Sequence, residues 1–187
     1  MKYLKTISLA VFSGLLFTAC SDDDNGDLPE VVNEEEIITT MTVTLVPNDD
    51  GAEIILKTFD ADGDGPGAPE ITVSDNLTAG VVYTGSIVLL NESVSPADDI
   101  TEEVEEEGDE HQFFYTSDSN LDVSTEYGNT DEDGNPLGTE FTLTAGAASA
   151  GTLTFTLRHE PKKPNDGTLA DAGGETDVDA TFDLVVE

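Results

Sequence analysis

The residues with the most specific spacing for chemistry form one Asp-rich loop. Asp60, Asp62 and Asp64 alternate with small residues, and Gly65 follows. Alternating carboxylates in a tight loop can converge on one hard cation, and glycine permits the sharp bend, as in the first half of a calcium-binding loop. Position twelve of such a loop is Ile71 here instead of a bidentate Glu. The sequence therefore predicts a Ca²⁺ site at the three aspartates, with ligands completed from elsewhere. The alternative is an acidic turn between strands.

A second acidic loop at 131–136 resembles the first more weakly, because Pro136 replaces the glycine and Asp133-Gly134 is a common hairpin turn. We interpret it as a turn, with a metal site as the less favoured alternative.

The chain has two histidines, His111 and His159. Two imidazoles and a carboxylate can bind a transition-metal ion such as Zn²⁺ or Cu²⁺. Successive side chains along a strand point to opposite faces. Each histidine therefore shares the buried face of its strand, while the neighbouring Glu110 or Glu160 points the opposite way. A metal site therefore requires the two strands to lie close together and Asp109 or Glu107 to fold in. The alternative is a histidine at the end of each core face, without a metal.

No pattern typical of a catalytic centre occurs. The sequence has no Gly-x-Ser-x-Gly elbow, no His-Glu-x-x-His and no phosphate-binding loop. The 187 residues include 41 Asp and Glu against 6 Lys and Arg, a formal net charge of −35. Binding to nucleic acid needs clustered basic residues, so this composition excludes a nucleic-acid partner. We expect a protein that is not an enzyme.

The start of the chain has the features of an export signal. Two lysines precede an apolar run over 7–17, which is too short to span a bilayer but typical of a secretory signal peptide. Thr18 and Ala19 then precede Cys20, the only cysteine of the chain, and this ending resembles a bacterial lipobox. We predict a signal peptide over 1–19 and an acyl anchor at Cys20 that attaches the protein to a lipid bilayer. A buried cysteine in an uncleaved segment is the alternative.

Residues 20–35 are polar and acidic, so they predict a disordered tether. Acidic residues directly after a lipidated cysteine resemble the surface-export signals of Bacteroidota lipoproteins. The resemblance implies attachment to the outer membrane facing the cell surface, with a periplasm-facing orientation as the alternative.

Most of the remaining chain alternates apolar and polar residues with a period of two. Nine segments with this pattern or with strand-like composition are separated by Gly, Pro, Asn and Asp: 36–46, 52–59, 70–74, 81–91, 111–117, 121–127, 139–144, 152–159 and 176–186. Many short strands with such turns predict an antiparallel β-sandwich of Ig-like or Greek-key type over 36–187. One short acidic helix is predicted over 95–107, with Ser95 as its N-cap and with Ile100 and Val104 on one face.

Several segments resemble a family of small, flavobacterial-type Bacteroidota lipoproteins of unestablished activity. The segments lie at 33–40, 90–93, 99–114, 157–161 and 173–177, and the resemblance extends over most of the chain after Cys20. Some members carry the label "type 1 periplasmic binding fold", a pair of α/β domains that this short, strand-rich chain does not support. The resemblance therefore implies the cellular location and the fold, and it implies no mechanism.

These features together predict a non-enzymatic, outer-membrane-anchored lipoprotein that acts as a binding or accessory module. A divalent cation, Ca²⁺ first, is the expected ligand, and an outer-membrane receptor is a candidate partner. The alternative is a structural or adhesive surface protein with no small ligand.

Overall fold

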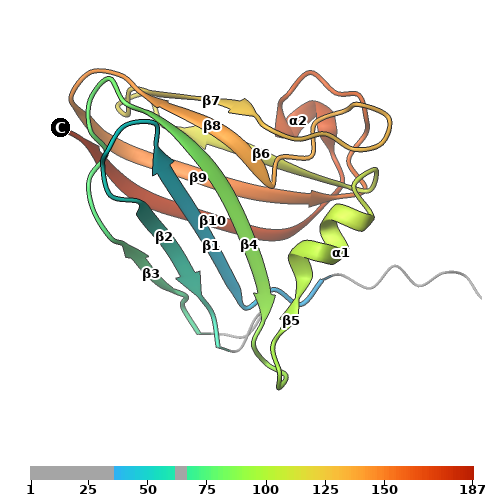
Figure 1. Ribbon diagram of the computed structural model, residues 1–187. Coiled ribbons are helices and arrows are strands. Elements are labelled where there is room, and N and C mark those ends of the chain that lie inside the picture. Colours follow the sequence, from blue (N-terminus) through green and yellow to red (C-terminus); the bar gives the residue numbers. More distant parts are fainter. Residues whose placement is uncertain (1–35, 62–66) are drawn as a thin grey trace, which may run out of the picture. The chain divides into compact units, whose positions relative to one another are not determined.

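The computed structural model describes residues 36–61 and 67–187 and folds them into two antiparallel β-sheets that pack against each other (Figure 1). The predicted mostly-β sandwich is therefore confirmed. The predicted signal peptide (1–19), Cys20 and the tether (20–35) lie outside the described residues, as do Asp62 and Asp64 of the predicted calcium loop.

The larger sheet has the strand order β3-β2-β1-β4-β8-β7, and the short β5 pairs with the end of β4. Its strands are β1 (Thr40–Pro47), β2 (Ile54–Phe59), β3 (Glu70–Val73), β4 (Val82–Asn91), β5 (Asp98–Asp99), β7 (Val123–Tyr127) and β8 (Glu140–Ala145). The smaller sheet has the order β10-β9-β6. It consists of β6 (His111–Ser117), β9 (Ser149–His159) and β10 (Glu175–Val186).

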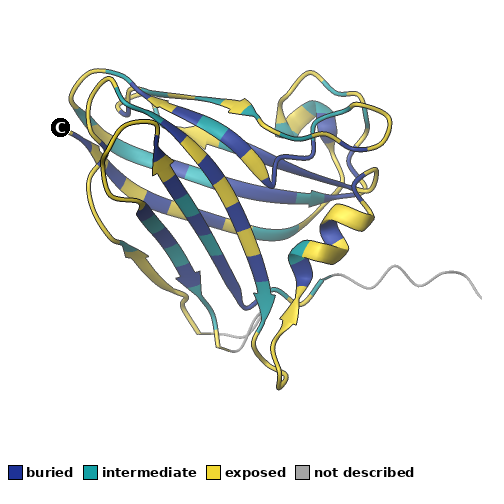
Figure 2. Cartoon of the chain, in the orientation of Figure 1, coloured by how far each residue is buried: buried dark blue, intermediate teal, exposed yellow. Residues whose placement is uncertain are grey.

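The period-two pattern of the sequence produces the core between the sheets. In β1, Met41, Val43 and Leu45 are fully buried, while the threonines between them are half-buried on the outer face. Buried and exposed positions alternate in the same way along β4 and β10 (Figure 2). Phe155 of β9 lies at the centre, with its ring centroid 5.7 Å from Phe141 and 5.9 Å from Phe182. Such aromatic pairs add to the stabilisation that burial of apolar surface provides.

The predicted helix is present but begins later than expected. Helix α1 spans Ile100–Glu106, and Asp99 is its N-cap in place of Ser95. Asp98 and Asp99 are extended because they pair with β4, and the Asp99 carboxylate accepts a hydrogen bond from the Thr101 N–H. Ser95 has equivalent cap chemistry, so the strand pairing decides where the helix starts.

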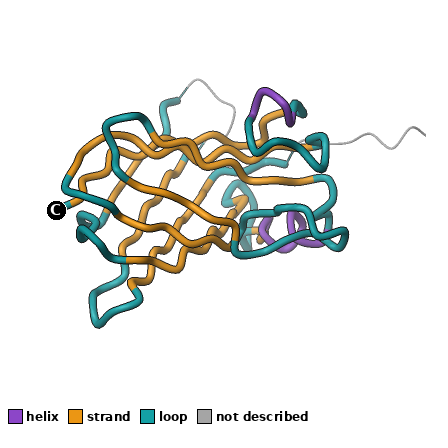
Figure 3. Tube along the Cα trace, turned by 90° about the horizontal axis from the view of Figure 1, so that it is seen from above, coloured by secondary structure: helices purple, strands orange, loops and turns teal. Residues whose placement is uncertain are grey.

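A second helix, α2 (Leu169–Ala172), was not predicted. Both helices lie at the end of the sandwich opposite the C-terminus (Figure 3). No helix in the described ranges combines the length and the apolar character needed to cross a membrane.

Candidate metal centre

Two histidines and one aspartate meet at one end of the smaller sheet. His111 begins β6 and His159 ends β9, and the two residues are direct partners in the antiparallel register. Asp177 comes from β10, which pairs with the other edge of β9. One nitrogen from each histidine and one carboxylate oxygen all lie within 4.8 Å of one another. The structure thus brings together the two predicted histidines, but the carboxylate is Asp177, and not Asp109 or Glu107.

The distances between these atoms suit a small ion. Asp177 Oδ2 lies 3.8 Å from His111 Nε2, and Asp177 Oδ1 lies 3.5 Å from His159 Nδ1. The centroids of the imidazole rings are 4.7 Å apart. Two ligands of a tetrahedral Zn²⁺, each at about 2.1 Å, are themselves roughly 3.4 Å apart. These two distances exceed that spacing by only ~0.1–0.4 Å, but the full set of donor atoms, which lie within 4.8 Å of one another, would have to close by up to about 1.4 Å to share one ion.

A β-bulge turns Asp177 toward the histidines. The register of β10 on β9 steps from Thr176 opposite Arg158 to Val178 opposite Leu157, so Asp177 is the extra residue. Bulges redirect side chains in this way and occur often beside functional sites. Strict alternation would place Asp177 on the outer face with Asp179, and this is why the sequence analysis missed it. The Gly-Gly pair just before β10 was the one local signal of irregular backbone.

Gly174 permits the close approach of β10 to the end of β9. Its φ is +72°, and a Cβ at this position would lie 2.2 Å from the His159 carbonyl oxygen. On the other side, the Glu160 N–H donates a hydrogen bond to the Glu110 carbonyl oxygen at 2.7 Å, joining the ends of β6 and β9. Backbone contacts on both sides therefore hold His159 in place.

His111 has the hydrogen-bonding arrangement of a metal ligand. Its Nδ1 lies 3.2 Å from the Glu107 carbonyl oxygen, which can only accept, so Nδ1 carries the proton. Nε2 is then a bare lone pair, is fully buried and has no hydrogen-bond partner among the described residues. Burial lowers the pKa of His111 to about 4, outweighing the Glu107 hydrogen bond that raises it. The imidazole is therefore neutral at pH 7, as a ligand must be.

Further carboxylates surround this cluster. Partial burial, together with the negative charges of Glu103, Asp177 and Glu107, raises the pKa of Glu36 to about 7. Glu36 lies shortly before β1, which begins at Thr40, and it is close enough to Asp177 and His159 for their charges to affect its pKa, so the chain enters the fold close to the histidines. A cation in the cluster would offset this accumulation of negative charge.

The predicted calcium loop is described only at its start. Asp60 follows β2 and lines a pocket of about 150 Å³ together with Asp177 and Asp179. Asp62 and Asp64 lie outside the described residues. Ca²⁺ binding at this loop therefore stays a prediction.

The second acidic loop, at 131–136, lies against the side chain of a lysine from another part of the chain. The Asp131 carboxylate accepts hydrogen bonds from the backbone N–H groups of Asp133 and Asn135 at 3.0 and 2.8 Å. The Lys163 ammonium lies 3.1 Å from the same carboxylate and also donates to the Gly108 carbonyl oxygen. The cation beside this carboxylate is thus the Lys163 ammonium, and the backbone hydrogen bonds to Asp131 agree with the interpretation of this loop as a turn.

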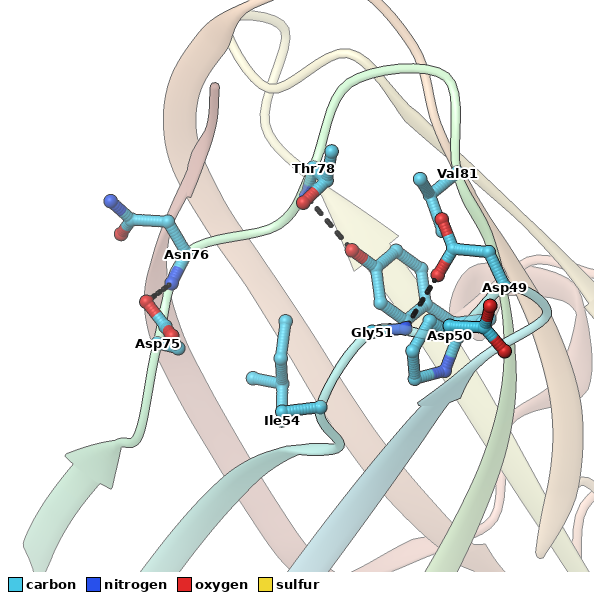
Figure 4. Close-up of a pocket in the computed structure, with 11 residues that line it drawn as sticks. Asp49, Asp50, Gly51, Ile54, Asp75, Asn76, Thr78 and Val81 are labelled. Atoms are coloured by element: carbon cyan, nitrogen blue, oxygen red, sulfur yellow. Dashed lines mark hydrogen bonds between the residues drawn. The ribbon is translucent and has the colours of Figure 1, made fainter.

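A larger pocket, of about 440 Å³, lies at the other end of β1 from Asp177 (Figure 4). Asp49 and Asp75 line it from the β1–β2 and β3–β4 connections. Their carboxylates accept hydrogen bonds from the backbone N–H groups of Gly51 and Asn76, so they shape their own turns.

Comparison of the chain with models of known protein families, with curated proteins and with solved structures found no match.

Proposed function

We propose that this protein is a non-enzymatic, lipid-anchored binding module whose β-sandwich holds a divalent transition-metal ion between His111, His159 and Asp177. The observation that carries the proposal is the buried cluster of two imidazoles and one carboxylate, with donor atoms within 4.8 Å of one another. Two nitrogen donors and one oxygen donor favour Zn²⁺ or Cu²⁺ over Ca²⁺, which prefers six or more oxygen ligands.

The hydrogen bonding favours an ion over simple core packing. A histidine that only fills the core is expected to satisfy both of its ring nitrogens. His111 instead directs a buried, bare Nε2 toward the Asp177 carboxylate at 3.8 Å. Two acceptors that face each other in a water-excluded site repel, and a cation between them turns the repulsion into attraction.

The lipobox at Cys20 and the acidic residues after it support attachment to the outer membrane by an acyl anchor, with the domain facing the cell surface. An outer-membrane receptor is the partner that this location suggests. Ca²⁺ binding at Asp60, Asp62 and Asp64 is a second candidate function, favoured by the spacing of these aspartates. A purely structural or adhesive role is the competing class, and it differs by requiring no metal.

Thermal unfolding of the full chain in detergent, with and without metal, tests the proposal. An ion that binds only the folded state, and is present at a hundred times its Kd, raises the free energy of unfolding by about 2.7 kcal/mol. For a chain of this size the melting temperature should then rise by about 5–11 °C. We expect this response with Zn²⁺ or Cu²⁺, and only a small, equal response with Mg²⁺ and Ca²⁺ if the acidic loop binds nothing specifically.

Matched variants locate the ion. Asp177→Asn and His159→Ala should abolish the Zn²⁺ response, whereas Asp183→Asn, an exposed aspartate on the same strand, should keep it. A Zn²⁺ response that survives in both Asp177→Asn and His159→Ala would contradict the proposal. A specific Ca²⁺ response that is lost in Asp62→Ala would support the second candidate function.

A further inference from the structure

The two histidines of the metal centre have their outer nitrogens directed at one short segment, the connection from α1 to β6. His111 directs Nδ1 at the carbonyl oxygen of Glu107, and His159 directs Nε2 at the carboxylate of Glu110. The His159 Nε2 to Glu110 Oε2 distance is 3.9 Å. Figure 1 shows the end of β9 beside the C-terminal end of α1, where this connection starts.

The ring of His159 thus stands between two carboxylates. Its Nδ1 faces the buried Asp177 at 3.5 Å, and its Nε2 faces Glu110, whose side chain is 48% exposed. An ion shared with His111 and Asp177 takes Nδ1, because this is the nitrogen on the Asp177 side. A neutral imidazole has one proton, so the proton must then be on Nε2, and the Glu110 carboxylate lies on that side of the ring at 3.9 Å.

The backbone keeps Glu110 in this position. Its carbonyl oxygen accepts the hydrogen bond from the Glu160 N–H, and Glu160 directly follows His159. The side chain therefore has to move inward by about 1 Å to form a normal hydrogen bond with Nε2. Its exposure leaves it free to make this movement when the ion binds.

From this geometry we infer that Glu110 is a positioning residue of the metal centre, forming a carboxylate–histidine–metal relay with His159. Such an outer carboxylate fixes the tautomer and the orientation of the ring and makes the coordinating nitrogen a stronger donor. Loss of an outer partner of this kind typically weakens metal binding by about 10–100-fold. This inference rests on the proposed function and goes beyond it by assigning the residue that sets the affinity.

The test compares Glu110→Gln with Glu106→Gln in the full chain, using competition with a chromophoric chelator to measure the Kd for Zn²⁺. Glu106 is an exposed residue of α1, four positions earlier, so both variants remove one charge from the same acidic segment. We expect Glu110→Gln to raise the Kd by about 10–100-fold and Glu106→Gln to change it by less than about twofold.

A second readout separates positioning from a general structural effect. In the Zn²⁺-loaded protein, ¹⁵N-detected spectra of the imidazole should show the Nε2 proton of His159 exchanging slowly in the wild type and in Glu106→Gln. The exchange should be fast in Glu110→Gln. Equal Kd values and equal exchange in the two variants would overturn the role of Glu110 and leave the metal site standing. Failure of the wild type to bind Zn²⁺ would overturn the proposed function and, with it, this inference.

Discussion

The side chains of Asp131 and Asp177 have no exposed surface, and their surroundings differ. Asp131 is paired with the ammonium of Lys163. Asp177 lies between two imidazoles, one of which is neutral at pH 7 because burial lowers the pKa of His111 to about 4. Buried charges in proteins are paired with opposite charges or coordinate metals. The ion pair at Asp131 shows how this chain places a lysine against a buried carboxylate, and a metal ion would take the corresponding role at Asp177.

The ion pair of Asp131 allows a sharp test at the residue level. Lys163→Ala removes a nearly buried ammonium and leaves the buried Asp131 carboxylate without its countercharge. Breaking a buried pair in this way costs about 3–5 kcal/mol. Lys162→Ala is the matched control, because Lys162 pairs with Asp171 at the surface, where such a pair contributes about 0–1 kcal/mol. Urea unfolding at pH 7 measures both losses.

The pH dependence of the free energy of unfolding is an independent test of the pair between Asp131 and Lys163. Burial alone would raise the pKa of Asp131, but hydrogen bonds from Asn135 and Lys163 outweigh it and hold the pKa below its usual value. The stabilisation by the pair is therefore present at neutral pH and is lost as the pH falls below the usual range of a carboxyl group. Equal losses in the two lysine variants at pH 7 would contradict this account of Asp131.

At the level of secondary-structure elements, the strands could be predicted because burial imposes the period of two. All nine predicted strands are present, and the predicted range 111–117 agrees with β6 at both ends. The pairing of β6 with β9, which brings the histidines together, could not be predicted, because it depends on the strand order of the sheet. The inward position of Asp177 could not be predicted either, since one extra residue in a bulge reverses the face on which a side chain lies.

The close approach of β10 to the end of β9, just before the bulge, depends on Gly174, and a substitution tests whether it positions the ligands. In Gly174→Ala the new Cβ would lie 2.2 Å from the His159 carbonyl oxygen, in addition to the strain of a φ of +72°. Gly167→Ala is the control, because its φ is +84° but nothing lies within 4 Å of the new Cβ. The positive φ alone costs about 1–2 kcal/mol in both variants.

We therefore expect Gly174→Ala to be the more destabilising of the two in urea unfolding, and only this variant to weaken Zn²⁺ binding. The reason is that the clash must displace either the end of β9, with His159, or the start of β10, with Asp177. A Zn²⁺ Kd unchanged in a folded Gly174→Ala protein would show that this close approach does not position the ligands.

For the whole molecule, the dominant property is the net charge of −35. Such a charge weakens the folded state through self-repulsion, which mobile ions screen. The proposed metal centre lies at the end of the sandwich where residues 36–39 lead into β1, close enough for Asp177 to raise the pKa of Glu36. The described chain therefore begins at the end of the sandwich that holds the two histidines and Asp177.

The effects of diffuse charge screening and of specific metal binding on the melting temperature should depend differently on the salt concentration. The screening length falls from about 30 Å at 0.01 M to about 3 Å at 1 M ionic strength. The melting temperature of the full chain, measured with chelator present, should therefore rise with NaCl by the same amount in the wild type and in His159→Ala. The Zn²⁺ response should occur at micromolar concentration, only in the wild type, and should persist at 1 M NaCl because the ligands are buried. If 1 M NaCl removed the Zn²⁺ response of the wild type, the ion would be part of the diffuse counterion atmosphere, and the metal centre would be ruled out.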